Sequence, residues 1–511
     1  VHAAAGIGGA AAGIELVASG LGAGVPVGAG RWLGTAALVL GEHVAVALAV
    51  AALAAAIPWR TLGSVRVGVA AWAAAVPSAV VLVGPGIARL AAEGQLVAAG
   101  VLGAVAIGLT GTAGVGATLW ARRALGEDGP RRTPPLGVLG LGIALAGATA
   151  GGVAQRERPA APGPEGAVIL LVTVAGLGSD AVPPGLAALG DGGVRFTQAI
   201  SPVPHPRAAE ATLLVGLHPL RHRVFGPSDR LSRAYTTAFE ALAALGLPTA
   251  AFVSDRAVAG GGLEQGFVRF DDDWALLPRT AFGRALPAGD DGRSAPATAE
   301  RFAAWAADRR GAWAAWVQLD AADGPEALDR AAATIAAAVA PARADGRLVL
   351  AVAGAYGPPG AGPGGVLADT AVLVPLALVL PGVEPRSVDA QVRLMDVAPT
   401  LVALGGGELA QSEGVTLGMY ARGMTAPLSC SLAGTDTEGT WWLGLRSNGM
   451  KVRFSADGRT LVHALDRDPG EQDDRAQQEP GVVEQARGVL SPDRAALAER
   501  CGAPCASWRL R

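Results

Sequence analysis

A group of ionisable residues lies near the middle of the chain, in and just after the stretch "FTQAISPVPHPRAAEATLLVG" at 196–216. Arginine and protonated histidine make charge-assisted hydrogen bonds to sulfate and phosphate oxygens. The candidate anion-binding residues are His205, Arg207, Glu210, Arg221 and His222. A solvated loop with ordinary ion pairs explains the same charges, and we favour it because charge clusters commonly occupy exposed faces.

Covalent catalysis would need a nucleophile with a base beside it. Two combinations are conceivable, Ser201 with His205, and Ser254 and Asp255 with His222. Neither serine lies in a Gly-x-Ser-x-Gly turn, and neither pair has a recognisable third member. The three acids at 271–273 are consecutive, so on a strand they would point to opposite faces rather than converge on a cation. The residues themselves therefore predict neither a catalytic group nor a metal ligand.

The composition indicates that part of the chain lies in lipid. Of the 511 residues, 51% are hydrophobic and the mean hydropathy is +0.37, which is high for an ordinary soluble protein. The net charge of −3 argues against nucleic acid as a partner, since phosphate backbones require concentrated basic residues. Membrane lipid is the partner that the composition predicts.

Apolar runs of membrane-spanning length occupy the N-terminal part of the chain. They lie at 32–59, 67–87, 96–120 and 136–154, with a weaker candidate at 3–23. A helix needs about 20 apolar residues to cross the hydrocarbon layer. We therefore expect an all-α transmembrane bundle of about five helices over 1–154. Glu42 and His43 lie within one run, where an ionisable residue indicates a functional role, an interhelical hydrogen bond or a shifted helix boundary.

The arginines flanking these runs predict the orientation. With five spans, the arginines at 60, 66, 122, 123, 131 and 132 share one side, and fewer lie opposite. The positive-inside rule places the larger set in the cytoplasm. The chain is then a multi-pass integral membrane protein whose C-terminal domain lies outside the cytoplasm. The "CGAPC" segment, Cys501 to Cys505, is either a disulfide loop in that compartment or a pair of free thiols.

The pattern changes after a charged, Pro/Gly-rich linker at 155–166. The run "AVILLVTV" at 167–174 is short, continuous and rich in Val and Ile, which is typical of a buried parallel strand. Helical stretches such as "TTAFEALAALG" then alternate with further apolar runs such as "RLVLAVAG". This alternation predicts an α/β fold with a mostly parallel sheet flanked by helices.

Six segments of this second part share an order and a spacing with a known family. They are "AVILLVTVAGLGSD", "GVRFTQAISPVPHPRAAEATLLVGLHPLRH", "LGLPTAAFVSDRAVAGGGLEQGFVRFDDDW", "AAWVQLDAADGP", "LADTAVLVPLALVLPG" with "QVRLMDVAPTLVALGG", and "LDRDPGEQDDRA". Together they resemble the sulfatase family of the alkaline-phosphatase superfamily. The resemblance implies a sulfatase-like α/β domain at 167–425 and a C-terminal sulfatase subdomain with a tail at 426–511.

The resemblance also implies a chemistry and shows what this chain lacks for it. Sulfatases use a divalent cation such as Ca or Mg held by carboxylates, a nucleophile beside it and basic groups on the ester oxygens. The matching positions here are degenerate, and Glu210 falls at the position of a basic group. These degenerate positions are Ala175, Pro206, Ala353 and Gly354. We therefore expect a chain without a cofactor and without catalytic residues.

Three hypotheses about function remain. The first is a membrane-anchored, sulfatase-like pseudoenzyme that binds a sulfated or phosphorylated envelope ligand, or a protein partner. The second is an active hydrolase or transferase of sulfuric or phosphoric esters with a rebuilt site. In the third, the transmembrane part is functional and the outer domain is a scaffold.

Overall fold

The computed structural model describes part of the chain, which divides into two compact units. The described residues are 44–45, 166–226, 229–255, 257–259, 261–272, 292–358, 365–447 and 449–501. One unit comprises Val1–Arg158 and Asp273–Asp290, and the other comprises Pro159–Asp272 and Asp291–Arg511. The predicted spans at 3–23, 32–59, 67–87, 96–120 and 136–154 lie outside the described residues except for positions 44 and 45, and so do Glu42 and His43. Within the described ranges no helix combines the length and apolarity needed to cross a bilayer.

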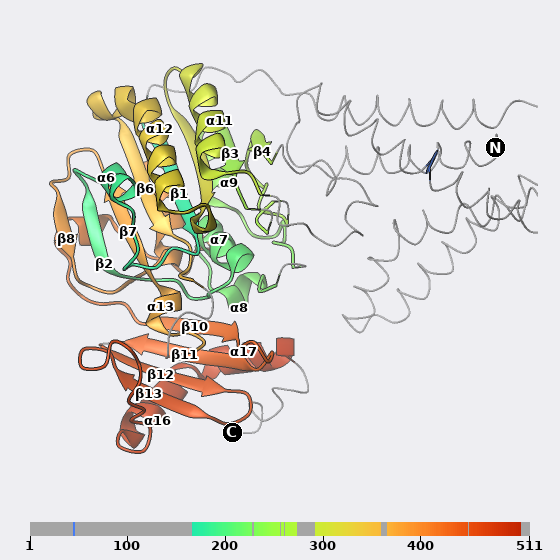
Figure 1. Ribbon diagram of the computed structural model, residues 1–511, viewed down its shortest axis with the longest axis vertical. Coiled ribbons are helices and arrows are strands. Elements are labelled where there is room, and N and C mark those ends of the chain that lie inside the picture. Colours follow the sequence, from blue (N-terminus) through green and yellow to red (C-terminus); the bar gives the residue numbers. More distant parts are fainter. Residues whose placement is uncertain are drawn as a thin grey trace, which may run out of the picture. The chain divides into compact units, whose positions relative to one another are not determined.

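A nine-stranded sheet forms the centre of the second unit (Figure 1). Its strand order is β4-β3-β5-β1-β6-β7-β2-β8, with β9 also paired to β2. The strands are β1 (Val168–Ala175), β2 (Val194–Ile200), β3 (Thr249–Val253), β4 (Arg269–Asp271), β5 (Trp313–Asp320), β6 (Leu348–Gly354), β7 (Leu373–Val379), β8 (Arg386–Val388) and β9 (Val392–Arg393).

Most pairs in this sheet are parallel, which confirms the predicted α/β architecture. The exception is β7, which runs antiparallel to both β6 and β2. Every residue of β1 is buried, as expected for a strand between two parallel neighbours with both faces covered. In β7 buried and half-buried residues alternate. The sheet is therefore mixed rather than wholly parallel.

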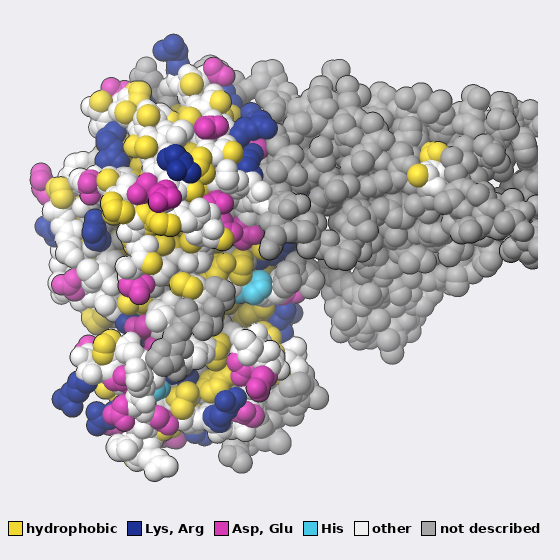
Figure 2. All heavy atoms as spheres, in the orientation of Figure 1, with side chains coloured by type: hydrophobic (Ala, Val, Ile, Leu, Met, Phe, Trp, Pro, Cys, Tyr) yellow, Lys and Arg dark blue, Asp and Glu magenta, His cyan; other side chains and the backbone are white. Residues whose placement is uncertain are grey.

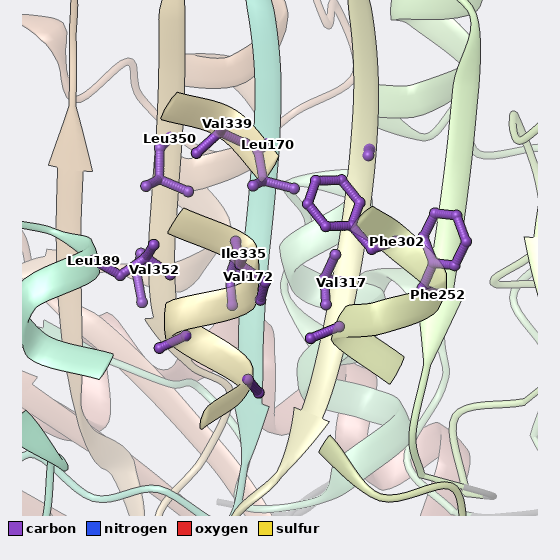
Figure 3. Close-up of a cluster of buried hydrophobic side chains, with 14 of the residues drawn as sticks. Leu170, Val172, Leu189, Phe252, Phe302, Val317, Ile335, Val339, Leu350 and Val352 are labelled. Atoms are coloured by element: carbon purple, nitrogen blue, oxygen red, sulfur yellow. The ribbon is translucent and has the colours of Figure 1, made fainter. Parts of the chain in front are cut away.

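Helices cover both faces of the sheet. On one face, α6 (Pro184–Leu189), α11 (Ala295–Ala307) and α12 (Pro325–Ala344) pack on the side chains of alternate strand residues. Figure 3 shows this core, with Ile335 of α12 against Val172 of β1 and with Phe302 of α11 beside Phe252 of β3. On the other face lie α7 (Pro206–Val215), α9 (Ala238–Ala244) and α14 (Val397–Leu404).

The contacts of the second face are close. A Cβ atom placed on Gly405 would lie 2.4 Å from the side chain of Leu242 on α9 and 3.2 Å from that of Ile169 on β1. Glycine at this position therefore lets the end of α14 approach the sheet. The short helices of the unit are α8 (Pro219–His222), α13 (Asp369–Val372), α15 (Gly418–Ala421), η2 (Ala321–Asp323) and η3 (Leu394–Asp396).

A separate four-stranded antiparallel sheet follows in the sequence. It is a meander of β10 (Cys430–Thr435), β11 (Trp441–Ser447), β12 (Met450–Ser455) and β13 (Thr460–Ala464), with α16 (Pro480–Val489) and α17 (Ser491–Cys501) packed on it. Cys430 is a buried free thiol, whereas Cys501 is disulfide-bonded. Figure 2 shows basic and acidic side chains interspersed over the visible face of the described part, without a broad area of one sign.

A buried ionic cluster connects the four-stranded sheet to α13. We call Asp369, Arg446, Lys451, Arg453 and Glu471 the C-terminal ionic cluster. The Lys451 ammonium lies 2.5 Å from Asp369 Oδ1 and 2.8 Å from Glu471 Oε1, and it donates a third hydrogen bond of 2.9 Å to the Leu367 carbonyl. All three of its donors are thus satisfied. Lys451 is the only lysine in the sequence, and its side chain is fully buried.

Replacing this ammonium should destabilise the fold strongly. Lys451→Met keeps most of the side-chain volume but leaves Asp369 and Glu471 facing fewer cations, and removing one partner of a buried ion pair costs about 3–5 kcal/mol. We expect that loss in the free energy of unfolding measured by urea denaturation. Arg195→Ala is the control, because its pair with Asp191 is exposed and 3.9 Å long, and surface changes stay within about 0.5 kcal/mol. Equal effects of the two variants would contradict the structural role of the cluster.

Candidate functional site

The carboxyl ends of four parallel strands meet at one edge of the large sheet. In open α/β sheets, ligands bind just beyond these ends. Here β1 ends at Ala175, which pairs with Asp320 at the end of β5, and Val174 pairs with Gly354 at the end of β6. The chain leaves β1 through Gly176, whose φ of +72° is the left-handed conformation that glycine adopts without strain. This edge, with the residues that follow each strand, is the candidate site.

The positions that match sulfatase metal ligands offer no donor atom. Ala175 and Ala353 are buried and have only methyl side chains. At Gly354 the backbone leaves no room for a side chain, because a Cβ atom there would lie 2.5 Å from the Leu177 carbonyl oxygen. This part of the edge is therefore closed by backbone and methyl groups.

The position that matches the nucleophile is structural. Pro206 is the first residue of α7, where its missing N–H and fixed φ suit a helix start.

The two serine–histidine combinations considered from the sequence are not hydrogen-bonded pairs in the structure. Ser201 donates to the Val203 carbonyl at 3.0 Å, and Ser254 shares a 2.7 Å hydrogen bond with Thr298.

Glu210 is a buried carboxyl at the end of a short hydrogen-bonded chain. Trp316 Nε1 donates to Thr173 Oγ1 at 2.9 Å, and the Thr173 hydroxyl donates to Glu210 Oε1 at 2.9 Å. Glu210 is fully buried, and its other oxygen, Oε2, has no hydrogen-bond partner. Burial raises the pKa of Glu210 to about 8, against the hydrogen bond from Thr173. At neutral pH this side chain is mostly a neutral acid.

His205 and Arg207 flank Glu210 at the start of α7, but neither presents an unused positive charge. Burial lowers the pKa of His205, and Arg207 lowers it further, so the ring is neutral at neutral pH. Its Nδ1 atom is buried without a partner. Arg207 donates to the carbonyl oxygens of Ala257 at 2.8 Å and Asp229 at 3.0 Å. The guanidinium thus fixes two loops.

Arg221 and His222 lie on α8 and serve other contacts. The Arg221 side chain is exposed and lies 3.0 Å from Glu413. His222 is buried, and its Nδ1 accepts from the Val224 N–H at 3.1 Å, so Nε2 carries the proton and donates to Thr212 Oγ1 at 3.0 Å. Burial lowers the pKa of His222 to about 3. The five candidate residues are therefore not brought together as one cationic pocket.

Three further polar residues end or follow these strands, and of them only Asp255 was considered from the sequence, together with Ser254 and His222. Asp320 ends β5, Asp255 follows β3 by two residues, and Tyr356 follows β6 by two. Burial raises the pKa of the Tyr356 hydroxyl, and the charges of Asp255, Asp320 and Glu210 raise it further. The sequence pattern that could have identified these residues is an acid or a phenol within two residues of the end of an apolar run, as in "TAAFVSD" and "WVQLD".

Gln318 holds the end of β3 in place. Its Oε1 accepts from the backbone N–H groups of Ser254 and Asp255, at 3.0 and 2.9 Å. Here the amide positions the loop that carries Asp255.

No family model and no curated protein matches the sequence. Solved structures do match the fold. Ps i-CgsB, crystallised with a neocarrahexaose, has a TM-score of 0.53 at 13% identity and covers 64% of this chain and 92% of its own. The phosphonate monoester hydrolase of Agrobacterium radiobacter has a TM-score of 0.51 at 16% identity, covering 67% and 96%. A 2-O glycosaminoglycan sulfatase has a TM-score of 0.51 at 15% identity, covering 68% and 94%.

At these identities the likeness establishes the fold alone. The chain has the mixed α/β sheet and helices of sulfatases and phosphonate monoester hydrolases of the alkaline-phosphatase superfamily, as the sequence resemblance implied. This finding contradicts the expectation of a chain without a cofactor, because proteins of these two classes normally use a metal ion. That expectation rested on Ala175, Pro206, Ala353 and Gly354, and missing donors at matched positions do not by themselves exclude a cation held by other residues.

The described side chains do not by themselves form a metal site. Within the ranges that the structure covers, no group of three or more His, Cys, Asp or Glu side chains is arranged to hold a metal ion. The positions that match the family's ligands lack donor atoms. We therefore assign no step of any reaction to a bound metal.

The raised pKa of Glu210 predicts a pH dependence of stability. The folded-state value of about 8 lies above the ordinary 4.5, so the folded protein holds a proton that the unfolded chain releases. The stability contribution is complete below pH 4.5 and is lost as the pH rises through 8. Between pH 4.5 and 8, ionisation of Glu210 should lower the free energy of unfolding by up to roughly 1.4 kcal/mol per pH unit. Glu210→Gln cannot ionise, so it should abolish this decrease.

Urea unfolding at several pH values checks this expectation. The wild-type and Glu210→Gln curves should diverge as the pH rises, whereas Asp191→Asn, an exposed carboxylate change, should run parallel to the wild type. Parallel curves for Glu210→Gln would place the Glu210 pKa near its ordinary value and contradict the burial argument.

Proposed function

We propose that this protein is membrane-anchored and carries an extracytoplasmic sulfatase-fold domain that binds or assembles without cleaving esters. The observation that carries the proposal is Pro206. It occupies the nucleophile position at the start of α7 and has no side-chain oxygen or sulfur. The proposal concerns the attacking atom and makes no claim about a cation.

The surroundings of Pro206 support loss of ester cleavage. An oxyanion in a transition state needs positive charge or hydrogen-bond donors aimed at it. The nearest arginine, Arg207, is engaged with two backbone carbonyls, and His205 is neutral. Glu210 stands where the family has a basic group.

The proposed location has two supports. The apolar runs before residue 155 are long enough to anchor the chain in lipid. The disulfide at Cys501 suits a domain outside the cytoplasm, because disulfides persist in oxidising compartments. Membrane lipid is accordingly the partner of the N-terminal part.

A second candidate function rests on Glu210. A buried carboxyl with a pKa of about 8 is the kind of group that enzymes use as a general acid or base. In this alternative, the chain is a hydrolase or transferase in which Glu210 activates water or a substrate hydroxyl. Its Oε2 atom, without a protein partner, would be the atom that exchanges the proton.

Ester turnover separates the two candidates. The purified full chain, supplied in turn with Ca, Mg, Mn and Zn, should show no turnover of an aryl sulfate, a phosphate monoester or a phosphonate monoester above the protein-free rate. Turnover that is abolished by Glu210→Gln and retained by Asp191→Asn would establish the second candidate and contradict the first.

Membrane anchoring has its own test. The full chain should remain in the pellet after alkaline carbonate extraction, and protease added outside intact spheroplasts should degrade the C-terminal domain. A cytoplasmic protein serves as the control for spheroplast integrity. Recovery of the chain in the carbonate supernatant, or protection of the domain until lysis, would contradict the proposed location.

A further inference from the structure

We infer that the carboxyl-edge site, formed by Asp255, Asp320, Tyr356 and Glu210, binds a ligand bearing a protonated amine rather than the oxyanion of a sulfate or phosphate ester. This inference deepens the proposed binding role and rests on it. The probe that represents the ligand class is an amino sugar.

The two aspartates lie side by side in the sheet register. Val253 of β3 pairs with Gln318 of β5, and Asp255 and Asp320 each follow their strand partner by two residues. Both are half-buried. The Gln318 side chain binds the N–H groups of Ser254 and Asp255 and so ties the two strand ends together.

Asp255 and Asp320 differ from four buried or half-buried acids of the described part that are paired with cations. Asp271 is paired with Arg269 and Arg293, and Asp396 is paired with Arg393. Asp369 and Glu471 share the cations of the C-terminal ionic cluster.

Asp255 and Asp320 instead each accept a backbone N–H two residues further on, at 2.7 and 2.9 Å. Neither forms an ion pair within the described residues. A half-buried carboxylate without a cation indicates a position that a cation can fill.

Glu210 gives an independent indication from another element. It is fully buried on α7, and its Oε1 is held by Thr173, two residues before the end of β1. Its Oε2 has no protein partner. The charge of Asp255 raises the pKa of Glu210, and the charge of Glu210 raises the pKa of the Tyr356 hydroxyl. Glu210 therefore lies at the same edge of the sheet. Since the Thr173 hydroxyl donates to Oε1, the proton of the neutral acid lies on Oε2. A cation bound nearby would favour release of that proton and leave a carboxylate oxygen that accepts a hydrogen bond.

The charges and donors at this edge favour an ammonium group over an oxyanion. Among the described residues, Arg207 is the cation that acts on Asp255, and its Nε and Nη1 groups are bound to backbone carbonyls. An ester oxyanion would meet both carboxylates. An ammonium group carries three donors, which the carboxylate oxygens of Asp255 and Asp320 and the phenol oxygen of Tyr356 can accept.

Three sugars that share one ring test the inference on the full chain in detergent. They are D-glucosamine, N-acetyl-D-glucosamine and D-glucosamine 6-sulfate, compared by calorimetry slightly below neutral pH, where the free amine is protonated. We expect D-glucosamine to bind about tenfold more tightly than its N-acetyl form, because acetylation removes the positive charge and two of the three N–H donors. The added sulfate should weaken binding.

Matched variants locate the site. Asp255→Asn and Asp320→Asn keep an oxygen that accepts the local backbone N–H, so the fold is preserved, and each should weaken glucosamine binding about tenfold. Asp345→Asn is the control. It changes an exposed carboxylate just before β6, at the opposite edge of the sheet, and should leave binding unchanged.

Four outcomes would overturn the inference. They are equal binding of the acetylated sugar, tighter binding of the sulfated sugar, stabilisation by Ca or Mg that depends on Asp320 without any glucosamine effect, and no binding of D-glucosamine. The proposed function would instead be contradicted by ester turnover. The binding inference and the proposed function can therefore be refuted independently.

Discussion

A charge held away from water must be met by an opposite charge or by enough hydrogen bonds, and this constraint organises the described part of the protein. The Lys451 ammonium satisfies it with two carboxylates and a carbonyl. Asp271 satisfies it with two arginines. The carboxyl edge of the large sheet departs from the rule, because among the described residues Asp255 and Asp320 form no ion pair and Glu210 keeps one oxygen without a partner. That departure makes the edge the candidate binding site.

Much of the large sheet was predictable because its central strands are buried on both faces. The continuous run 168–175 has the composition of a parallel strand and forms β1. Direction is harder to predict. The segment that forms β7, "LVPLALV", is apolar at every position, so its alternating burial leaves no trace in the residue types, and its antiparallel pairing depends on the path of the preceding loop.

The candidate site was harder to predict than the sheet. Through the resemblance to sulfatases, Ala175, Pro206 and Ala353 predict positions without a metal donor or a nucleophile, and this stays a prediction. The anion-binding group was inferred from closeness in sequence, yet His222 turns inward toward Thr212 and Arg221 outward toward Glu413. Asp255 and Asp320 are 65 residues apart in sequence, and only strand pairing brings them together.

The burial of Lys451 has a practical consequence for handling the protein. Since it is the only lysine in the sequence and its side chain is fully enclosed, amine-reactive dyes and lysine-specific proteases find no lysine side chain on the native fold. Modification of that single amine would mark molecules whose β12 has separated from α13. Lysine reactivity thus reports whether the four-stranded sheet remains packed against α13.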